Sequence, residues 1–421
     1  MKNLIFIALL CIASILNAQQ FDLSAEVRPR YENKHGYGIL INEDTNGSNF
    51  VSQRTRLNFN FEHEKIRLGV SLQNVRVWGD VSTLSSDDTA TALHEAWAVA
   101  VLSPEISLKL GRQEIVYDDH RIFGNVGWAQ QARSHDALLF KYVPNGNNRL
   151  DVGFALSADS QSGVANLYSN AAGYKSFQYG WYHGDFDKLG LSFLLLNTGI
   201  EYLENAGLSD ESQTIDYMQT IGPRITYKLG DLNANAAAYF QTGKSLNRDV
   251  TASYFSGNIG YKVSSDFTVG AGFEMLSGKD MDDADLDIKS FSPLFGTNHK
   301  FNGWMDYFYV GNHANSVGLT DVSVTLAYAK DKFSAKIIPH YFLAAADVFN
   351  DATKMNANLG TEIDMVVGYK IAKDIILNAG YSKMYATASM EILKGGGKDS
   401  NNSWGWIMFT FKPILFTTKT E

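Results

Sequence analysis

Apolar and polar residues alternate along segment after segment of this chain, and this alternation constrains the fold more than any other feature. It is seen in residues 21–28, again in residues 57–61 and again in residues 333–337. Side chains of a β-strand point alternately to opposite faces, so each segment has one apolar and one polar face. A wall between lipid and water needs this pattern. The sequence therefore predicts an all-β fold, a transmembrane antiparallel up-and-down β-barrel.

The first 18 residues have the features of a cleavable secretory signal. Lys2 gives a positive start, an apolar run follows as far as Leu16, and Ala18 is a small residue at the expected cleavage point. The run of about 13 residues is too short for a membrane-spanning helix, which needs about 20. We therefore expect a signal peptide over 1–18 and a single outer-membrane barrel domain over 19–421.

Cysteine usage and charge argue against several classes of function. The single cysteine, Cys11, lies inside the predicted signal, so the mature chain has no thiol for a disulfide or a metal site. The formal net charge of −9 disfavours nucleic acid as a partner. After the signal, no run of about 18 apolar residues predicts a transmembrane helix.

The connections between the predicted strands are alternately short and long. About 18 strands are predicted, and turns such as 63–65, 103–105 and 372–374 are short. Barrels of the bacterial outer membrane have short periplasmic turns, longer outer loops and an even number of strands. We therefore expect a chain surrounded by outer-membrane lipid and lipopolysaccharide, with both termini in the periplasm. The long connections are 33–50, 79–92, 118–134, 159–174, 200–216, 278–318, 345–359 and 387–402, and 244–250 is of modest length.

Several tyrosines suit an aromatic girdle at the membrane surface, where the ring is half-buried and the hydroxyl stays hydrated. Cross-strand packing in an ordinary sheet is the alternative. The residues are Tyr227, Tyr261, Tyr328, Tyr369 and Tyr381.

If the apolar face meets lipid, the charged residues of the opposite face line the lumen. Nine of the twelve arginines fall in the first third of the chain, on strands that are neighbours in a closed barrel. Arginine binds carboxylates and phosphates and keeps its charge, and fixed charge in a narrow pore selects ions. The pattern predicts a channel that favours anions. The alternative is that arginine and glutamate pair with each other in a crowded interior. The predicted inward set is Glu26, Arg28, Arg30, Glu32, Arg54, Arg56, Glu62, Lys141, Arg224, Lys228, Glu274, Lys336, His340, Glu362 and Asp364.

Two longer stretches resemble the alginate export family of Gram-negative outer-membrane porins. The first begins with Leu-Gly-Arg-Gln-Glu at 110–114 and runs to Asp136. The second covers 291–306, and the segment 318–321 follows it. The strand series fits the family over nearly all of residues 21–412. The resemblance implies a single 18-stranded barrel whose loops fold into or over a polar, arginine-bearing channel.

The resemblance also implies roles for individual residues. Arg112, Arg121, Arg133 and Asp136 would belong to the wall and the constriction, and His299 and Asp306 would belong to the long loop. Alternation raises a difficulty at Arg112, because Leu108 and Leu110 share its face. Either that face has left the bilayer by residue 112, or Arg112 does not face the lumen.

A run of carboxylates in the long loop is a candidate calcium site, because calcium binds several oxygen ligands. The sequence lacks the spaced Asp/Asn-Gly ligand pattern, so a solvated outer loop is the alternative, and otherwise no cofactor is expected. The residues are Asp280, Asp282, Asp283, Asp285 and Asp287.

An enzyme is not expected. Ser134-His135-Asp136 contains the residue types of a catalytic triad, but adjacent strand residues point to opposite faces and cannot converge. A hydrolase that takes Ser and His from separate strands is the alternative.

The resemblance implies passive diffusion or export of anionic solutes or polysaccharide through the barrel. The alternatives are a general or neutral-oligosaccharide porin and a closed barrel whose outer loops bind or anchor. The solute, the direction of transport, the pore radius and the oligomeric state stay open.

Overall fold

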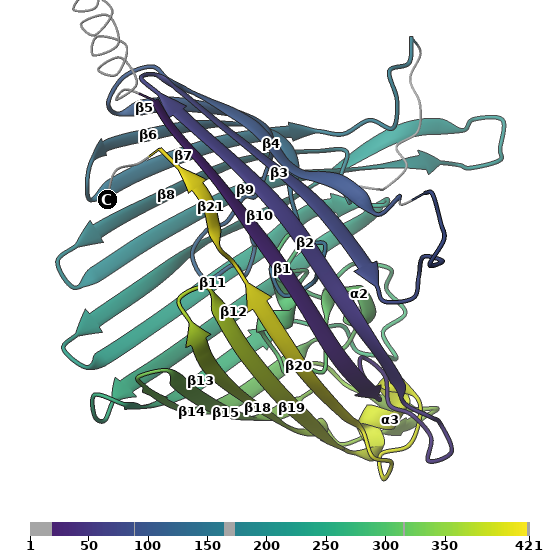
Figure 1. Cartoon of the computed structure of the whole chain (residues 1–421). Helices are drawn as coiled ribbons and strands as arrows, with labels where there is room; N and C mark the ends of the chain where they lie inside the picture. The colour runs from purple at the N-terminus through teal and green to yellow at the C-terminus, as the bar shows by residue number, and fades with distance from the viewer. Residues whose placement is uncertain (1–18, 88, 164–172, 315, 419–421) are drawn as a thin grey trace, which may run out of the picture.

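The computed structural model describes residues 19–87, 89–163, 173–314 and 316–418, so the predicted signal at 1–18 lies outside the described residues. Antiparallel strands close into one barrel of 18 strands (Figure 1), which confirms the fold predicted from alternation. In the described part of the chain, no helix is both long and apolar enough to cross a membrane.

The strands follow each other in chain order around the wall. Residues 349–354 form a separate two-stranded hairpin within the expected long connection 345–359. The strands are β1 (Gln19–His35), β2 (Ser48–His63), β3 (Ile66–Val77), β4 (Thr91–Val101), β5 (Ile106–Gln113), β6 (His135–Asn145), β7 (Asn148–Leu156), β8 (Ser176–Phe186), β9 (Leu189–Glu204), β10 (Ser212–Leu229), β11 (Leu232–Ser245), β12 (Arg248–Lys262), β13 (Phe267–Leu276), β14 (Leu319–Lys330), β15 (Phe333–Leu343), β16 (Phe349–Asn350), β17 (Thr353–Lys354), β18 (Asn358–Ala372), β19 (Ile375–Ala386), β20 (Ser403–Phe411) and β21 (Ile414–Thr417). The helices are a 3₁₀ turn η2 (Asn298–Lys300), α2 (Val310–His313) and α3 (Ala388–Lys394).

The barrel closes where β1 pairs with β2 on one side and with β20 and β21 on the other. The last strand is interrupted at Pro413, between β20 and β21. Proline has no backbone N–H to give to the ladder, although its carbonyl oxygen still accepts a hydrogen bond from Ala25 N at 3.1 Å.

Short turns gather at one end of the barrel and long connections at the other. Asp187 and Asp331 begin two of the short turns with positive φ values of 56° and 52°, a conformation that Asp tolerates. At the opposite end, β9 and β10 stay paired from Leu189↔Tyr227 to Glu204↔Ser212. The expected loop 200–216 is therefore mostly a long hairpin, because tertiary pairing extends the strands beyond the alternating segment.

Apolar side chains cover the outer face of the wall, as a lipid-facing surface requires. Leu195, Phe154 and Val367 are among the large apolar residues exposed there. Of the predicted girdle tyrosines, Tyr227 and Tyr261 lie next to short turns, whereas Tyr381 lies midway along β19.

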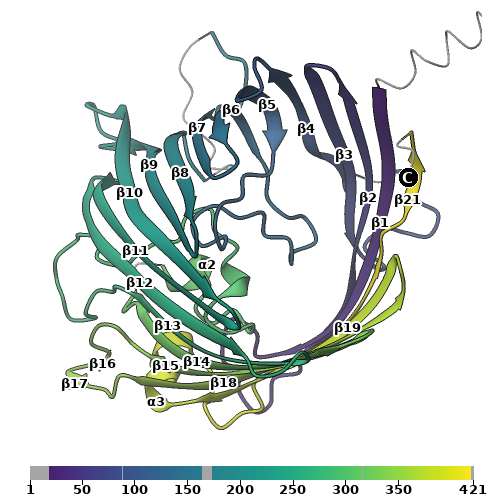
Figure 2. The ribbon, with the colours of Figure 1, turned by 90° about the vertical axis from the view of Figure 1, so that its left-hand side faces the viewer.

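Two connections fold inward and place the hydrophobic core inside the barrel. They are residues 114–134 after β5, here called the first inner loop, and residues 277–318 after β13, the second inner loop. Figure 2 shows the chain after β5 and the helix α2 within the ring of strands. Phe123 of the first loop and Phe295 of the second pack against Phe177 of β8. The lumen is therefore partly filled by the chain itself.

Candidate functional site: the constriction inside the barrel

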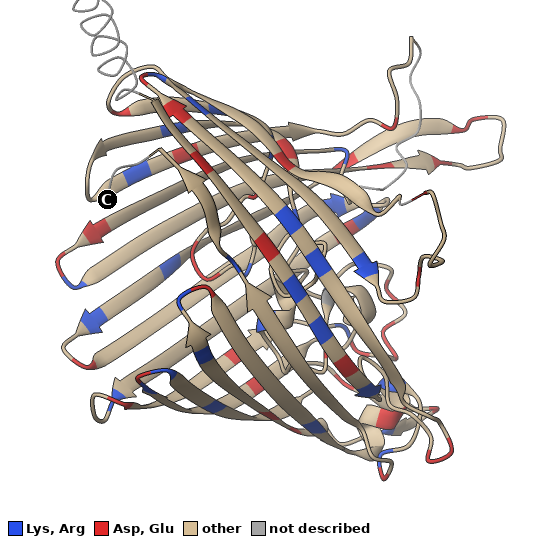
Figure 3. Ribbon diagram, viewed as in Figure 1, with Lys and Arg blue, Asp and Glu red and all other residues tan. Residues whose placement is uncertain are grey.

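Neighbouring strands β1 and β2 carry a row of buried charges on their inner face. Figure 3 shows charged positions gathered along both strands. Arg28 lies directly opposite Arg54 in the register, and like charges in that position repel. Each arginine has a different partner: Arg54 Nη2 lies 2.5 Å from Glu26 Oε1, while Arg28 turns to the first inner loop. Arg56 Nε donates to Gln73 at 2.6 Å.

Arg28 holds the first inner loop through carbonyl oxygens. Its Nη1 donates to Gly127 O at 2.8 Å, and its Nη2 donates to Trp128 O at 3.1 Å and Ala129 O at 3.2 Å. Arg30 Nη1 also donates to Trp128 O, at 2.8 Å. The guanidinium group is suited to this because its five N–H donors form a rigid planar fork.

Trp128 joins the wall, the first inner loop and the second inner loop. The Arg30 guanidinium lies 4.1 Å from its ring centroid, and the His299 ring stacks on it at 5.0 Å with an interplanar angle of 16°. His299 Nδ1 lies 2.9 Å from Asp306 Oδ1, and the Tyr37 hydroxyl donates to the same carboxylate. The structure thus brings together His299 and Asp306, the two long-loop residues implied by the resemblance.

The two inner loops bind each other directly. Arg121 Nη2 donates to Asn302 Oδ1 at 2.9 Å and to Glu274 Oε2 on β13 at 3.1 Å. Arg133 Nη1 donates to Gly296 O at 3.1 Å. Backbone bonds add to these contacts, including Gly124 N to Phe295 O at 2.9 Å. The loops therefore form one body across the lumen.

Carboxylates on β18 hold the second inner loop from the other side. Glu362 Oε1 accepts the Met305 N–H at 2.8 Å, and Asp364 Oδ2 accepts the Trp304 N–H at 3.0 Å. Both carboxylates are 0% exposed. His340 on β15 lies between Asp364, at 3.6 Å, and Asp321, at 3.0 Å. Arginines thus hold carbonyl oxygens of one loop, and carboxylates hold N–H groups of the other.

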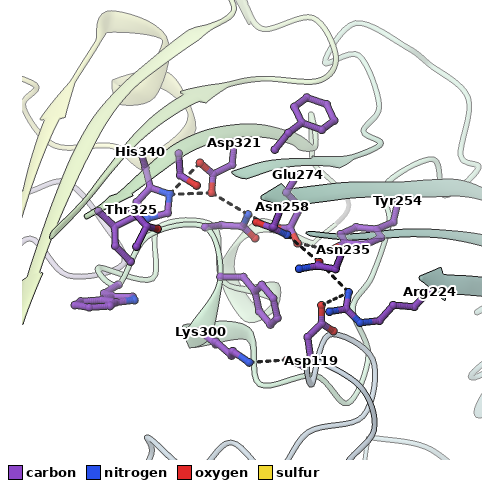
Figure 4. Close-up of a pocket in the computed structure, with 16 residues that line it drawn as sticks. Asp119, Arg224, Asn235, Tyr254, Asn258, Glu274, Lys300, Asp321, Thr325 and His340 are labelled. Carbon is purple, nitrogen blue, oxygen red and sulfur yellow. Dashed lines mark hydrogen bonds and ion pairs between the residues drawn. The ribbon is translucent and has the colours of Figure 1, made fainter. Parts of the chain in front are cut away.

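A cavity of about 380 Å³ lies beside the loops on the short-turn side of the lumen (Figure 4). Arg224 Nη1 pairs with Asp119 Oδ2 at 3.0 Å, and Lys300 Nζ donates to the backbone oxygen of Asp119 at 3.0 Å. Trp304 lines the same cavity, and Lys336 Nζ lies 5.2 Å from its ring centroid. Lys300 and Lys336 form no ion pair within the described ranges.

A second cavity of about 450 Å³ lies on the long-loop side of the constriction. Lys34, Tyr37, Arg76 and Trp128 are among its lining residues, together with Asp306. Charged and aromatic side chains therefore flank the loops on both sides, in the pattern of a polar channel narrowed at its middle.

Arg112 and Asp136 lie elsewhere. They pair with each other at 2.8 Å between β5 and β6, with side chains 42% and 68% exposed. Their neighbours Gln113 and His135 are buried and face the lumen, so alternation turns this pair to the outer face. The implied position in the pore wall or constriction is therefore corrected for both residues. Lys141 shares the inward parity of Leu139 on β6.

Gln130 is a residue of the constriction that the sequence analysis missed. It is 4% exposed, accepts from Arg28 and donates to Ser52 O at 3.2 Å. Asn302 likewise links Arg121 to the wall. Both residues lie in loops whose sequences have no periodicity, so the sequence does not indicate where their side chains point.

The acidic run of the second inner loop is largely engaged by other groups of the chain. Lys289 Nζ lies 2.7 Å from Asp283 and 3.4 Å from Asp285, and Asp280 Oδ1 accepts the backbone N–H of Asp347 at 2.7 Å. Among the residues that the structure describes, no group of three or more His, Cys, Asp or Glu is arranged to hold a metal ion.

Among the described residues, a serine and a histidine from separate strands do meet inside the barrel. Ser192 Oγ lies 2.9 Å from His183 Nδ1, and His183 Nε2 lies 3.3 Å from Asp185 Oδ1. The Ser192 hydroxyl, however, donates to Asp118 Oδ1 at 2.5 Å. Its proton is directed to a carboxylate instead of the imidazole, so this is not the arrangement of an activated nucleophile.

Comparisons with known proteins agree with this architecture. The model of a family described as alginate export matches residues 19–405. A search of curated proteins finds no match. Among solved structures, OccK9 (OpdG) of Pseudomonas aeruginosa is similar with a TM-score of 0.63 and 13% identity, over 94% of this chain and 98% of that one. OccAB4 of Acinetobacter baumannii gives 0.62 and 11% identity over the same shares. OccK2 (OpdF) of Pseudomonas aeruginosa, in complex with glucuronate, gives 0.59 and 13% identity, again over 94% and 98%.

Proposed function

Because this chain belongs to the alginate export family and is a porin-like channel of the outer membrane, we propose that it passes small acidic sugars by diffusion between the wall and the two inner loops. The wall arginines Arg28 and Arg30 serve mainly as anchors of the first inner loop. The charges that select the solute therefore lie at the cavities and not in the row of wall arginines.

The pair Lys300 and Lys336 carries this proposal. Both amines lie at or next to the cavity on the short-turn side, and no described carboxylate forms an ion pair with either one. Fixed cations in a narrow polar passage raise the local concentration of anions and exclude cations. Glucuronate in the similar OccK2 structure supports a carboxylated sugar as the type of solute.

Reversal potentials across a planar bilayer, under a gradient of KCl and separately of potassium glucuronate, test this charge preference. We expect the wild type to favour chloride and glucuronate over potassium, and the double variant Lys300→Gln, Lys336→Gln to lose that preference severalfold. Lys188→Gln, on an exposed short turn, is the matched control and leaves selectivity unchanged. A wild-type channel that prefers potassium contradicts the proposal.

A neutral-oligosaccharide porin is the second candidate. Such channels need aromatic faces along which sugar rings slide. Trp128 offers none, because Arg30 covers one face of its ring and His299 stacks on it as well. Liposome uptake of glucuronate and glucose separates the two candidates, because faster entry of glucose favours the neutral porin. A closed barrel whose loops bind or anchor is the remaining alternative. It would show no conductance at all in the planar bilayer.

We also propose that the short turns and both termini face the periplasm, as in other outer-membrane barrels. Cys11 is the only cysteine of the sequence, so single-cysteine variants can be labelled selectively. A membrane-impermeant maleimide applied to intact cells should label Leu208→Cys, in a long connection, and spare Ser265→Cys, in a short turn. The reverse pattern would invert the orientation.

Passage through the channel is proposed to require no chemistry and no cofactor. If calcium has a role, it acts through the carboxylates of 280–287. In that case EDTA lowers the melting temperature of the wild type and of Asp283→Asn by different amounts. We expect conductance and melting temperature to be the same with calcium and with EDTA.

A further inference from the structure

The barrel wall has a notch at its long-loop end, above the end of β5. Strand β5 is short, and its pairing with β4 runs only from Ala96↔Arg112 to Val101↔Ser107. Residues 91–95 of β4 pair with β3 on one side, and no described strand pairs with them on the other. The wall is therefore incomplete between β4 and β6.

Local features of both strands produce this notch. The β3–β4 register shifts between Ser71 and Leu72, so His94 is an extra residue in β4. Such a bulge bends a strand and increases its twist. In β5, Gly111 has φ +110°, and a Cβ there would lie 2.3 Å from Ala96 O. The chain then leaves the wall after Gln113 as the first inner loop.

A cavity of about 650 Å³ occupies the notch and is lined from both sides of the wall. Leu93 and Arg112 reach it from the outer face, whereas Gln73, Arg133 and His135 reach it from the lumen. Where strands of a barrel are paired, the pairing separates the inner face from the outer face. Here residues of both faces line one cavity.

The charges of the cavity leave one cation without an anionic partner. On the outer side, Arg112 is paired with Asp136. The buried His94 Nε2 lies 2.8 Å from Glu114 Oε1, and Asp159 is an exposed carboxylate at the rim of the cavity. Arg133, on the lumen side, donates to Gly296 O but forms no ion pair with a described residue. Burial lowers the pKa of its guanidinium. A partly desolvated cation of this kind is stabilised by a bound anion.

Apolar side chains continue down the outer face from the notch. Leu93, Leu110 and Leu138 are 48%, 49% and 39% exposed there. An occupant with a polar, anionic head and apolar chains matches both parts of this surface. Its head enters the cavity, and its chains lie along the leucines.

We propose that the notch between β4 and β6 binds the phosphorylated sugar headgroup of an outer-leaflet glycolipid, with Arg133 and Arg112 as the phosphate contacts. This site lies outside the constriction and does not depend on which solute the channel carries. It makes part of the lumen wall out of lipid and gives the barrel a lateral contact with one class of lipid.

Native mass spectrometry of the full-length mature chain in detergent, with purified diphosphoryl lipid A added, tests the site. We expect a one-to-one adduct whose apparent affinity falls about tenfold in Arg133→Gln and in Arg112→Gln, the loss of one charge-assisted contact. Arg67→Gln is the control, because Arg67 pairs with Glu62 by a short turn on the far end of the wall. Retained heat-modifiable migration in gels shows that each variant is folded.

Leu93→Glu provides a second test that removes no existing hydrogen bond. A carboxylate at this exposed position should repel the phosphate and also weaken the adduct. Equal adducts in the wild type and all notch variants would overturn the proposal. Displacement of lipid A by millimolar inorganic phosphate would show a free-anion site and overturn the assignment to lipid, whereas resistance to phosphate supports it.

Discussion

Arg28 and Gln130 are joined by hydrogen bonds that run in both directions. Arg28 donates to Gln130 Oε1 from Nε at 3.1 Å and from Nη2 at 2.9 Å, while Gln130 Nε2 donates back to Arg28 O at 3.4 Å. A wall residue and a loop residue thus satisfy each other where water has little access. Few rotamers of either side chain keep these bonds, so the first inner loop is held in one position.

Substitution of Arg28 by alanine should release the first inner loop. Gly127, Trp128 and Ala129 would each lose a donor to their carbonyl oxygens. Hydrogen bonds to a charged group contribute about 1.5–3 kcal/mol, so we expect a cost of roughly 3 kcal/mol in loop anchoring. Single-channel recordings should show larger and noisier conductance. Arg248→Ala, at the first residue of β12, is the control, and indistinguishable traces from the two variants would argue against the anchor.

Substitution of Gly303 by alanine should detach the second inner loop from β18. Gly303 has φ +80°, and a Cβ there would lie 2.7 Å from the Glu362 carboxylate. Gly207 has nearly the same φ, +79°, with no atom within 4 Å of its Cβ position. Both variants carry a backbone strain of about 1–3 kcal/mol, so only the contact with Glu362 differs. Faster proteolysis of Gly303→Ala than of Gly207→Ala is the expected result, and equal rates would exclude a role for that contact.

The segment around α2 should loosen in acid. Burial is the main reason that the pKa of His313 is lowered to about 4 from 6.5. The unfolded segment therefore binds more protons than the folded one between these values. The stabilisation is complete above pH 6.5 and is lost as the pH falls toward 4, by an amount on the order of 3 kcal/mol.

Hydrogen exchange of residues 304–319, corrected for intrinsic rates, measures this loss. The neutral ring accepts from Ser316 Oγ at 3.3 Å and donates to Gly318 O at 3.0 Å, an assignment that follows from the hydrogen-bond pattern. His313→Gln can keep the donor but does not titrate. Its exchange should not change across this range, and a wild-type profile that is equally flat would contradict the expectation.

Substitution of Ser192 by alanine should not change the rate of ester hydrolysis by the barrel. Its hydroxyl donates to Asp118, and the side chain is buried at 4% exposure. Phospholipid and p-nitrophenyl ester assays on the wild type and Ser192→Ala should both give background rates. Activity in the wild type that disappears in the variant would restore the hydrolase alternative.

Alternation predicted the wall well because it is a local property. In β1 and β18, a period of two is enough to place Arg28, Arg30, Glu362 and Asp364 on the inner face, and the structure places all four there. The same rule gives the right face for Arg112, where it conflicts with the family resemblance. The alternation of side chains within one strand does not depend on the neighbouring strands, so the rule holds at the unusual end of β5.

The partners of these residues could not be predicted in the same way. Arg28 binds backbone oxygens of 127–129, and every residue type carries such an oxygen. The inner loops also meet over a long separation in sequence, as in the contact of Arg133 with Gly296. Without periodicity in the loops, the sequence gives no direction for their side chains. The preference of wall arginines for the chain itself over a solute was therefore visible only in the structure.

Both inner loops are anchored through main-chain atoms, so the position of each loop does not depend on which side chains it carries. Positions 127–129 keep their acceptors whatever side chains they carry, and positions 304 and 305 keep their donors with any residue except proline. Substitutions in these segments can thus change the shape of the passage while the loops stay anchored to the wall. A barrel built this way can acquire a new solute through a few changes in its loops, with no redesign of its strands.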